Sequence, residues 1–356
     1  MKLIELSKTL ESEFELIKIN NQYSTLQGKT IFITGATGLI GSYLISFLEY
    51  LNRTQKCNIK IVALSRSKKT AQLFFDGFPN VEVIEGDIVN KINYADKIDY
   101  IIHGASNTHP IDYSTKPIET IMTNILGTRN ILDFSIVKAV KRVIFLSSVE
   151  IYGENKGDVD LFDESYLGAI DCNTLRAGYP ESKRLAESLF SAFHKEYSLD
   201  YVVLRLSRVF GPTMRINDSK VLSQFIKNAA EKKDIVLKSK GNQLYSYIYV
   251  GDAVSSIIKV LFDGNNTEAY NVAIPDFDLS LYDIAKLISR KYELNVIFEE
   301  ASQIERAGYS KATKAQMNVK KLNSIGWKSI FAFDTYIFRT IDSIRESFFQ
   351  TDFDTL

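Results

Sequence analysis

Cysteine and histidine are scarce in this chain of 356 residues, which contains two cysteines and three histidines. Cys57 and Cys172 show neither a CxxC pair nor a metal-like spacing, so we expect no disulfide framework. His103, His109 and His194 are too few for a histidine-rich metal site, and we expect no metal. The cysteine usage fits a reducing compartment and predicts a cytoplasmic protein.

Net charge and long apolar runs are also lacking. The 43 basic and 43 acidic residues cancel, which argues against binding to nucleic acid or to a membrane surface through bulk charge. No apolar run reaches the ~18–20 residues that a bilayer-spanning helix needs. Acidic residues interrupt the N-terminal segment, which is not typical of a signal peptide. We therefore expect neither a membrane nor a nucleic acid as a partner.

Short apolar segments alternate with helical patterns through the first 210 residues. Strands are predicted at 29–34, 59–64, 81–84, 100–103, 142–146 and 201–206, and helices at 39–51, 117–138 and 182–197. The alternation predicts an α/β fold with a Rossmann-type, doubly wound parallel sheet. The strands are continuously apolar, which indicates that helices cover both faces of the sheet.

The alternation weakens after residue 212 and predicts three parts. Residues 1–28 form an N-terminal helical extension beside the first strand, which either covers core surface or contacts another subunit. Residues 29–212, with about 250–264 and 336–350, form an NAD(P)-binding Rossmann domain. Residues 213–249 and 265–335 form a smaller mixed α+β domain for the substrate, and the interleaved boundary predicts one cleft between the two.

A GxxGxxG pattern follows the first predicted strand and opens the first long helix. Gly35 permits a tight turn, Gly38 lets backbone amides approach a pyrophosphate, and Gly41 lets the helix pack closely on the sheet. Because the strand–loop–helix context is present, the pattern predicts a dinucleotide site.

The end of the second strand indicates which dinucleotide binds. An acidic residue there binds the ribose of NAD, whereas a nearby arginine accommodates the 2′-phosphate of NADP. This chain has Ser65 and Arg66 and no acid, which favours NADP over NAD unless Arg66 belongs only to a solvated loop. Asp87, after the third strand, is placed to contact the adenine amine.

Tyr179 and Lys183 form a YxxxK pattern, which places both side chains on one helical face. A tyrosine with its ordinary pKa of about 10 is a poor base at neutral pH. A neighbouring lysine cation, together with a bound nicotinamide, is expected to lower that pKa. Ser147 and Ser148 close the fifth strand, at the edge where open parallel sheets bind ligands, although a serine pair there also suits a turn or a helix cap.

These patterns resemble the extended short-chain dehydrogenase/reductase family, in particular its nucleotide-sugar epimerases, dehydratases and decarboxylases. The matching segments are TGATGLIG at 34–41, HGAS at 103–106, Asn124 with Gly127 and Thr128, SSVEIYG at 147–153, YPESK at 179–183, RVFGP at 208–212 and YIYVGD at 247–252. They occur in family order and cover roughly residues 29–330.

The resemblance implies a shared first step, in which Tyr179 removes the proton of the sugar 4-hydroxyl while C4 passes a hydride to the nicotinamide. Ser148 shares the hydrogen bond, and Lys183 also holds the nicotinamide ribose. Together the patterns and the resemblance assign the cofactor to Gly35, Thr37, Gly38, Leu39, Ile40, Ser65, Arg66, Asp87, Ile88, Gly104, Ala105, Ser106, Asn124, Ser147, Tyr179, Lys183 and Arg208. They assign the substrate to Ser148, Val149, Glu150, Arg176, Val221, Lys238, Tyr245 and Arg306.

The resemblance separates the possible reactions only in part. Glu150 matches the glutamate that is the C5 base of the 4,6-dehydratases, but Val149 replaces their acid. Arg176 is similar to an arginine of the decarboxylases. However, Tyr245 replaces a family arginine that contacts phosphate or the substrate carboxylate, and Arg306 is the candidate to serve the pyrophosphate instead.

We therefore expect an epimerase or dehydratase, with Tyr179, Lys183, Ser148 and Glu150 as catalytic residues and internal recycling of the cofactor. The alternatives are an NADPH-dependent carbonyl reductase, a less favoured decarboxylase, and a non-catalytic dinucleotide sensor. The resemblance also implies a homodimer, in which two helices of each subunit, at 117–138 and 182–197, form a four-helix bundle.

Overall fold

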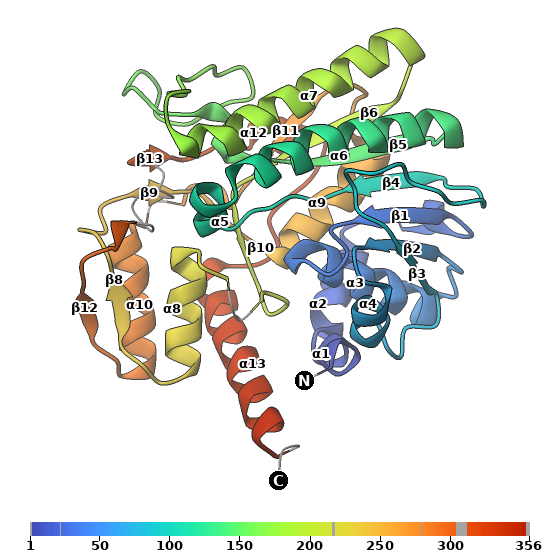
Figure 1. Ribbon diagram of the computed structural model, residues 1–356. Coiled ribbons are helices and arrows are strands. Elements are labelled where there is room, and N and C mark those ends of the chain that lie inside the picture. Colours follow the sequence, from blue (N-terminus) through green and yellow to red (C-terminus); the bar gives the residue numbers. More distant parts are fainter. Residues whose placement is uncertain (1, 22, 216–217, 278, 304–311, 354–356) are drawn as a thin grey trace.

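Seven parallel strands form the central sheet of the computed structural model, which describes residues 2–21, 23–215, 218–277, 279–303 and 312–353 (Figure 1). Their spatial order is β11 (Ala269–Val272), β6 (Tyr201–Leu206), β5 (Arg142–Ser148), β4 (Tyr100–His103), β1 (Thr30–Thr34), β2 (Lys60–Ser65) and β3 (Val81–Glu85). The chain reverses direction across the sheet after β3, between β1 and β4. This reversal is the position at which doubly wound folds bind ligands, and it confirms the predicted Rossmann-type sheet.

Both faces of the sheet are apolar, because alternate residues of each strand point to opposite sides. Ile31 and Ile33 pack into one hydrophobic cluster, and Phe32 between them packs into the other. Helices α6 (Pro117–Lys138) and α7 (Gly178–Tyr197) cover the face of Phe32, while α3 (Leu39–Gln55) and α9 (Val250–Asp263) cover the opposite face. The short helix α4 (Lys68–Phe74) packs beside β3.

The N-terminal extension consists of two helices, α1 (Leu3–Thr9) and α2 (Glu11–Ile19), where the sequence indicated one. They pack on α3 and α9 and not beside the first strand, since α3 already covers that part of the sheet. Glu13 of α2 is buried, and its Oε2 accepts hydrogen bonds from Tyr43 at 2.8 Å and Tyr249 at 2.7 Å. Burial raises the pKa of Glu13, against the opposing effect of these bonds.

A second lobe lies beyond the carboxyl ends of the strands (Figure 1). Its helices are α8 (Val221–Ala230), α10 (Leu281–Tyr292) and α13 (Phe333–Phe353), whereas the short helix α12 (Lys320–Ser324) packs against β11. Its strands form three parallel pairs: β7 (Arg208–Phe210) with β10 (Tyr247–Tyr249), β8 (Ile235–Leu237) with β12 (Val296–Phe298), and β9 (Leu244–Tyr245) with β13 (Lys314–Ala315). The shorter helical segments are η1 (Ser24–Leu26), α5 (Pro110–Thr115), η2 (Val149–Tyr152) and η3 (Leu175–Ala177).

Two elements lie differently from the predicted division of the chain. Strand β11 extends the main sheet, because its residues pair in register with Val203–Leu206, although the sequence placed 265–335 in the substrate-binding part. Helix α13, which the sequence grouped with the first domain, packs against α8 and β10. The other domain boundaries stay predictions. Among the described residues, no helix combines the length and the apolar character that crossing a bilayer requires.

Helix α6 exposes an apolar stripe. Ile118, Met122 and Leu126 recur every four residues and are 73%, 44% and 44% exposed. Leu185 of the neighbouring helix α7 is 45% exposed. Large apolar side chains exposed on two packed helices favour the predicted homodimer interface.

We predict that the protein is a homodimer and that Met122→Glu combined with Leu126→Glu produces a monomer, because two carboxylates would be buried in the bundle. Light scattering would then report twice the chain mass of 40.4 kDa for the wild type and one chain mass for the variant. The matched control is Leu167→Glu, an exposed leucine outside α6 and α7. A monomeric wild type at micromolar concentration would contradict the prediction.

Candidate functional site

A large cavity separates the carboxyl ends of the main-sheet strands from the second lobe. Its volume is about 1610 Å³, which exceeds the roughly 300–1,000 Å³ that is typical of a site for one small ligand. The wall combines the loop after β1, the ends of β4 and β5, the first turns of α7, and residues of β7, β8 and α8. The cavity therefore has room for two ligands of moderate size.

Most of the residues that the sequence assigned lie on the wall of this one cavity. They are Gly35, Thr37, Gly38, Leu39, Ile40, Ser65, Arg66, Asp87, Ile88, Gly104, Ala105, Ser106, Ser147, Ser148, Val149, Glu150, Arg176, Tyr179, Lys183, Arg208, Val221, Lys238 and Tyr245. Asn124 lies behind the wall, and Arg306 is outside the described residues.

The loop after β1 requires glycine at two positions. Gly35 has φ of +71°, and a Cβ there would lie 2.7 Å from the carbonyl carbon of Gly104. A Cβ on Gly41 would lie 2.3 Å from the Gly35 carbonyl oxygen. These contacts support the predicted tight turn and close packing. Helix α3 starts directly after Gly38, so its N-terminal amides face the cavity as an anion site requires.

The end of β4 is hydrogen-bonded to the end of β1 beside this loop. The Thr34 hydroxyl accepts from the amides of Gly104 at 3.1 Å and Ala105 at 3.0 Å, which leaves its proton to donate to His103 Nδ1 at 2.8 Å. Burial lowers the pKa of His103 to about 3, so the imidazole is neutral and its Nε2 donates to Thr128 at 3.1 Å. This network holds the backbone under the predicted cofactor site in one arrangement.

Asn124 positions other residues and does not face the cavity. Its Oδ1 accepts from Ser106 Oγ at 2.7 Å, and its Nδ2 donates to Ser182 Oγ at 2.8 Å. Asn124 is 2% exposed, since α6 turns it inward between β4 and α7. It therefore links a cavity-lining serine to the first turns of α7.

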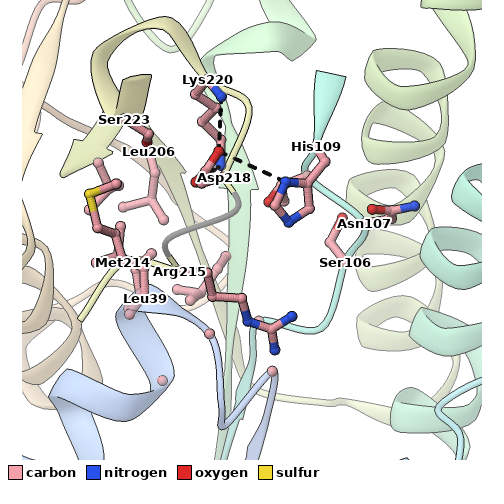
Figure 2. Close-up of a pocket in the computed structure, with 18 of the residues that line it drawn as sticks. Leu39, Ser106, Asn107, His109, Leu206, Met214, Arg215, Asp218, Lys220 and Ser223 are labelled. Carbon is pink, nitrogen blue, oxygen red and sulfur yellow. Dashed lines mark hydrogen bonds and ion pairs between the residues drawn. The ribbon is translucent and has the colours of Figure 1, made fainter. Parts of the chain in front are cut away.

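The segment after β7 crosses the glycine loop, a feature that the sequence did not indicate. Figure 2 shows Arg215, Asp218 and His109 around this end of the cavity. Arg215 Nη2 donates to Thr37 Oγ1 at 3.2 Å, and His109 Nδ1 lies 3.8 Å from Asp218 Oδ1. Arg215 therefore places a cation beside the loop that is built to receive an anion.

Tyr179 and Lys183 meet the end of β5 at the centre of the cavity wall. Helix α7 begins at Gly178, four residues before the predicted start, so both side chains belong to its first turns. Lys183 Nζ donates to the Leu146 carbonyl oxygen at 2.9 Å. Ser148 hydrogen-bonds to Tyr179, which assembles the predicted tyrosine, serine and lysine.

Burial is the largest influence on the pKa values of Tyr179 and Lys183. It raises the pKa of Tyr179 to about 12, and the Ser148 hydrogen bond opposes that rise. The lowered tyrosine pKa expected from the sequence requires a bound nicotinamide as well as Lys183, and it stays a prediction. Burial also lowers the pKa of Lys183 to about 7.

Tyr113 of α5 belongs to the site, and the sequence analysis missed it. Its ring stacks on Tyr179 with centroids 4.7 Å apart and an interplanar angle of 23°. The Arg176 guanidinium lies 4.7 Å from the ring centroid of Tyr113. No sequence pattern near Tyr113 indicates this role, since α5 follows an irregular segment.

Glu150 lies between two arginines. Its Oε2 accepts from Arg176 Nη2 at 2.6 Å, and its Oε1 lies 3.7 Å from Arg208 Nη2. Arg208 in turn lies 3.4 Å above the ring of Tyr245. The sequence assigned Arg208 to the cofactor, whereas its charged partner in the structure is the substrate-assigned Glu150.

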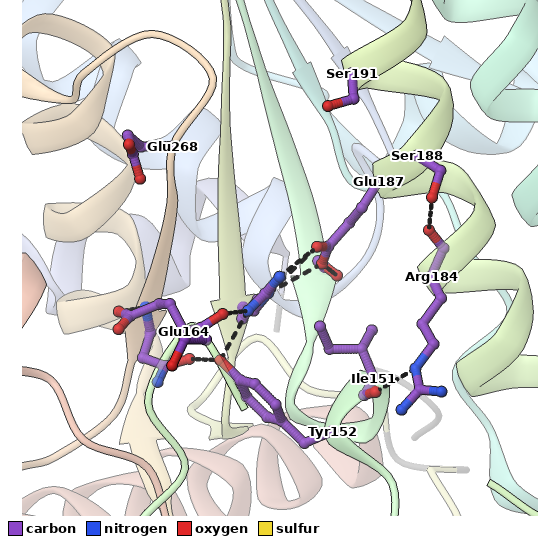
Figure 3. A network of polar contacts seen from close by, with 12 residues as sticks. Ile151, Tyr152, Glu164, Arg184, Glu187, Ser188, Ser191 and Glu268 are labelled. Atoms are coloured by element: carbon purple, nitrogen blue, oxygen red, sulfur yellow. Dashed lines mark hydrogen bonds and ion pairs between the residues drawn. The ribbon is translucent and has the colours of Figure 1, made fainter. Parts of the chain in front are cut away.

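A buried polar network supports the end of β5 from behind (Figure 3). Glu187 of α7 accepts from Ser147 Oγ at 2.5 Å and from Arg205 Nη2 at 2.8 Å. Arg205 also donates to Tyr152 Oη at 3.1 Å. Ser147, which the sequence assigned to the cofactor, therefore uses its hydroxyl proton within the protein. Among the described residues, no group of three His, Cys, Asp or Glu side chains is placed to hold a metal ion.

Comparisons with known proteins identify the family and the fold of the chain. The sequence model of the "NAD dependent epimerase/dehydratase family" matches residues 31–273. The chain is 30% identical over 260 residues to UDP-glucuronic acid decarboxylase 3 of Arabidopsis thaliana, which covers 72% of this chain and 73% of that protein. The solved structures that share the fold include two that are named as epimerases. UDP-N-acetylglucosamine 4-epimerase from Methanobrevibacter ruminantium M1, in complex with UDP-N-acetylmuramic acid, has a TM-score of 0.76 at 23% identity, with 90% and 99% of the two chains covered. UDP-glucuronic acid 4-epimerase from Bacillus cereus, in complex with UDP-glucuronic acid and NAD, has a TM-score of 0.74 at 20% identity, with 89% and 99% covered.

We predict that Lys183 makes the stability of the cofactor-free protein depend on pH. Its folded pKa of about 7 lies below the ordinary lysine value of about 10.4, so the unfolded chain binds one proton more between these values. The free energy of unfolding should therefore increase with pH through this window. Urea denaturation at several pH values should show that Lys183→Met removes that increase, while the exposed-lysine control Lys97→Met retains it. Equal pH dependence in wild type and Lys183→Met would contradict the prediction.

Proposed function

The chain belongs to the NAD-dependent epimerase/dehydratase family, and we propose that it oxidises C4 of a nucleotide-linked sugar and then reduces the same sugar within one binding event. Relatives include nucleotide-sugar epimerases, dehydratases and decarboxylases. The observation that carries this proposal is the convergence of Tyr179, Ser148 and Lys183 on a cavity that also contains the glycine loop. A bound nicotinamide dinucleotide supplies the hydride acceptor and donor for such chemistry.

The residues of the loop fit a dinucleotide. The constrained glycines leave backbone amides exposed at the start of α3, and Arg215 adds a cation beside Thr37. At the far wall, Tyr179 is placed to take the proton of the sugar 4-hydroxyl, and Ser148 holds that hydroxyl in line. Lys183, buried beneath them, supports the charge that develops on the phenol oxygen.

Tyr179→Phe is expected to reduce the chemical step by about 10²–10⁴-fold, the usual contribution of a positioned acid–base group. Nucleotide sugars incubated with each variant are assayed by mass spectrometry and chromatography, and dinucleotide affinity is measured by calorimetry. Affinity should largely survive, because the substitution leaves the glycine loop unchanged. Turnover by Tyr179→Phe close to that of the wild type would refute the proposed role.

The reaction that follows oxidation is proposed first as epimerisation or dehydration. Glu150 is the carboxylate nearest to the catalytic serine in sequence, and it is available as a base at C5. Val149 is buried and apolar, which disfavours dehydration because no acid at that position assists the departure of a 6-hydroxyl. The alternative to these reactions is net reduction of a carbonyl substrate by NADPH.

Decarboxylation is a second candidate, and specific observations favour it more than the sequence analysis did. Relatives at 29–30% identity are named as UDP-glucuronic acid decarboxylases. Arg208 also brings a guanidinium against Tyr245, at the position where the sequence lacks an expected arginine.

The mass of the product decides among these reactions. Loss of carbon dioxide, loss of water and an unchanged mass correspond to decarboxylation, dehydration and epimerisation. We predict that Glu150→Gln abolishes any exchange of the C5 proton with deuterium oxide, because an amide is no base, while oxidation at C4 persists. Full activity of Glu150→Gln would instead indicate plain C4 epimerisation. Glu119→Gln, an exposed glutamate elsewhere on the cavity wall, is the control.

The choice of NADP over NAD remains a prediction. Arg66 lies on the cavity wall after β2, is 74% exposed and forms an ion pair with Glu119 at 3.7 Å. Calorimetry should show tighter binding of NADP, and Arg66→Ala should narrow the difference because a 2′-phosphate loses its cation. Lys68→Ala is the neighbouring control. Tighter binding of NAD by the wild type would overturn this preference.

A further inference from the structure

Two guanidinium groups at one end of the cavity retain N–H donors that have no hydrogen-bond partner among the described residues. Nε and Nη1 of Arg176 and Nη1 of Arg208 are buried and unpaired. Buried donors are costly unless something accepts from them. Since both residues line the cavity, a bound ligand is the natural acceptor.

The charges of the cluster also require an anion. Arg176 and Arg208 share the single carboxylate of Glu150, at 2.6 Å and 3.7 Å, which leaves one positive charge uncompensated. Both side chains are mostly buried, at 16% and 23% exposure, so water screens that charge weakly. Planar guanidinium groups bind oxyanions through paired hydrogen bonds.

Aromatic rings hold both guanidinium groups in place before any ligand binds. Arg208 lies 3.4 Å above Tyr245, whose hydroxyl donates to the Ala312 carbonyl oxygen at 2.9 Å. Arg176 lies 4.7 Å from the ring centroid of Tyr113. Cation–π contacts of this kind fix the direction of the free N–H groups. Arg208 is therefore a preorganised donor and not a solvated side chain.

The position of the cluster identifies the anion. The ring of Tyr113 contacts both Tyr179 and the Arg176 guanidinium, and Glu150 follows Ser148 by two residues. In a sugar whose 4-hydroxyl binds Tyr179, the substituent of C5 is adjacent to that hydroxyl, whereas the pyrophosphate is attached through C1 across the ring. C3, the other neighbour of C4, carries an uncharged hydroxyl in an ordinary hexose, so the oxyanion beside Tyr179 is assigned to the substituent of C5.

We propose that Arg176 and Arg208 bind a carboxylate attached to C5, which makes the substrate a nucleotide-linked uronic acid and Arg208 a residue that determines specificity. This inference rests on the proposed oxidation at C4. It also accounts for Val149, because a uronic acid has no 6-hydroxyl to expel and needs no acid at that position. The β-phosphate of the nucleotide is the other oxyanion that the same chemistry accepts, and the experiment separates the two.

Binding is measured by calorimetry on NAD-loaded protein carrying Tyr179→Phe, which suppresses turnover. The affinities for UDP, dTDP, CDP and GDP are compared first. The nucleotide that binds most tightly is then tested as its conjugate with glucuronate and as its conjugate with glucose. The glucuronate should bind at least about tenfold more tightly. Arg208→Gln should remove that preference while the affinities for the glucose conjugate and the free nucleotide change less than about threefold. The double variant Arg208→Gln/Tyr245→Arg should restore part of the preference, because it returns a guanidinium to the same end of the cavity. Arg53→Gln, at an exposed arginine of α3 outside the cavity, is the matched control and should leave the preference intact.

Equal affinity for the two conjugates in the Tyr179→Phe background would overturn the proposal. If Arg208→Gln lowers the affinity for both conjugates and for the free nucleotide equally, the proposal is also overturned. That pattern would identify the β-phosphate as the partner of Arg208. Thermal unfolding of each variant shows whether it is folded, and Arg208→Lys replaces Arg208→Gln if the glutamine variant is not. Because these affinity measurements need no turnover, their outcome does not depend on whether the proposed oxidation at C4 takes place.

Discussion

The attachment of helix α7 to the end of strand β5 is the constraint on which the site depends. Lys183 donates to the Leu146 carbonyl, and four residues later Glu187 accepts from Ser147, so one face of the helix is fixed to two consecutive residues of the strand. Tyr179, one turn before Lys183, is thereby held against Ser148. The cost of this arrangement is a buried lysine whose pKa falls to about 7, because burial outweighs the opposing effect of the Glu187 charge. In the proposed function, Tyr179 and Lys183 act on the substrate once cofactor and substrate are bound.

Charge is distributed in the cavity so that each end suits a different ligand group. At the glycine loop, backbone amides and Arg215 surround a position that suits phosphates. At the opposite end, Arg176 and Arg208 share one carboxylate and keep unpaired donors. Tyr179 lies close to this end, because the Tyr113 ring contacts both Tyr179 and Arg176. Two ligands match this distribution: a dinucleotide whose phosphates bind at the glycine loop, and a separate nucleotide-linked acidic sugar at the two arginines.

Much of this architecture was predictable from sequence, because it follows from local patterns. Alternating apolar strands and helices predicted the parallel sheet, and the glycine loop and the YxxxK pattern identified opposite walls of one cavity. Contacts between distant segments were not predictable. Tyr113 joins the site only because α5 folds back on α7, and Arg208 meets Glu150 only because β7 turns toward the second lobe. The pKa of Tyr179 depends on burial, which spacing along the chain does not report.

The most direct test of the account follows a deuterium atom placed on C4 of the nucleotide sugar. Oxidation and reduction within one binding event predict that the product keeps the deuterium, and that a mixture of labelled substrate and a second, unlabelled substrate of different mass shows no transfer of label between them. No added dinucleotide should be consumed. Loss of the deuterium to added NAD(P), or stoichiometric oxidation of added NADPH, would contradict internal recycling and identify the protein as a net oxidoreductase.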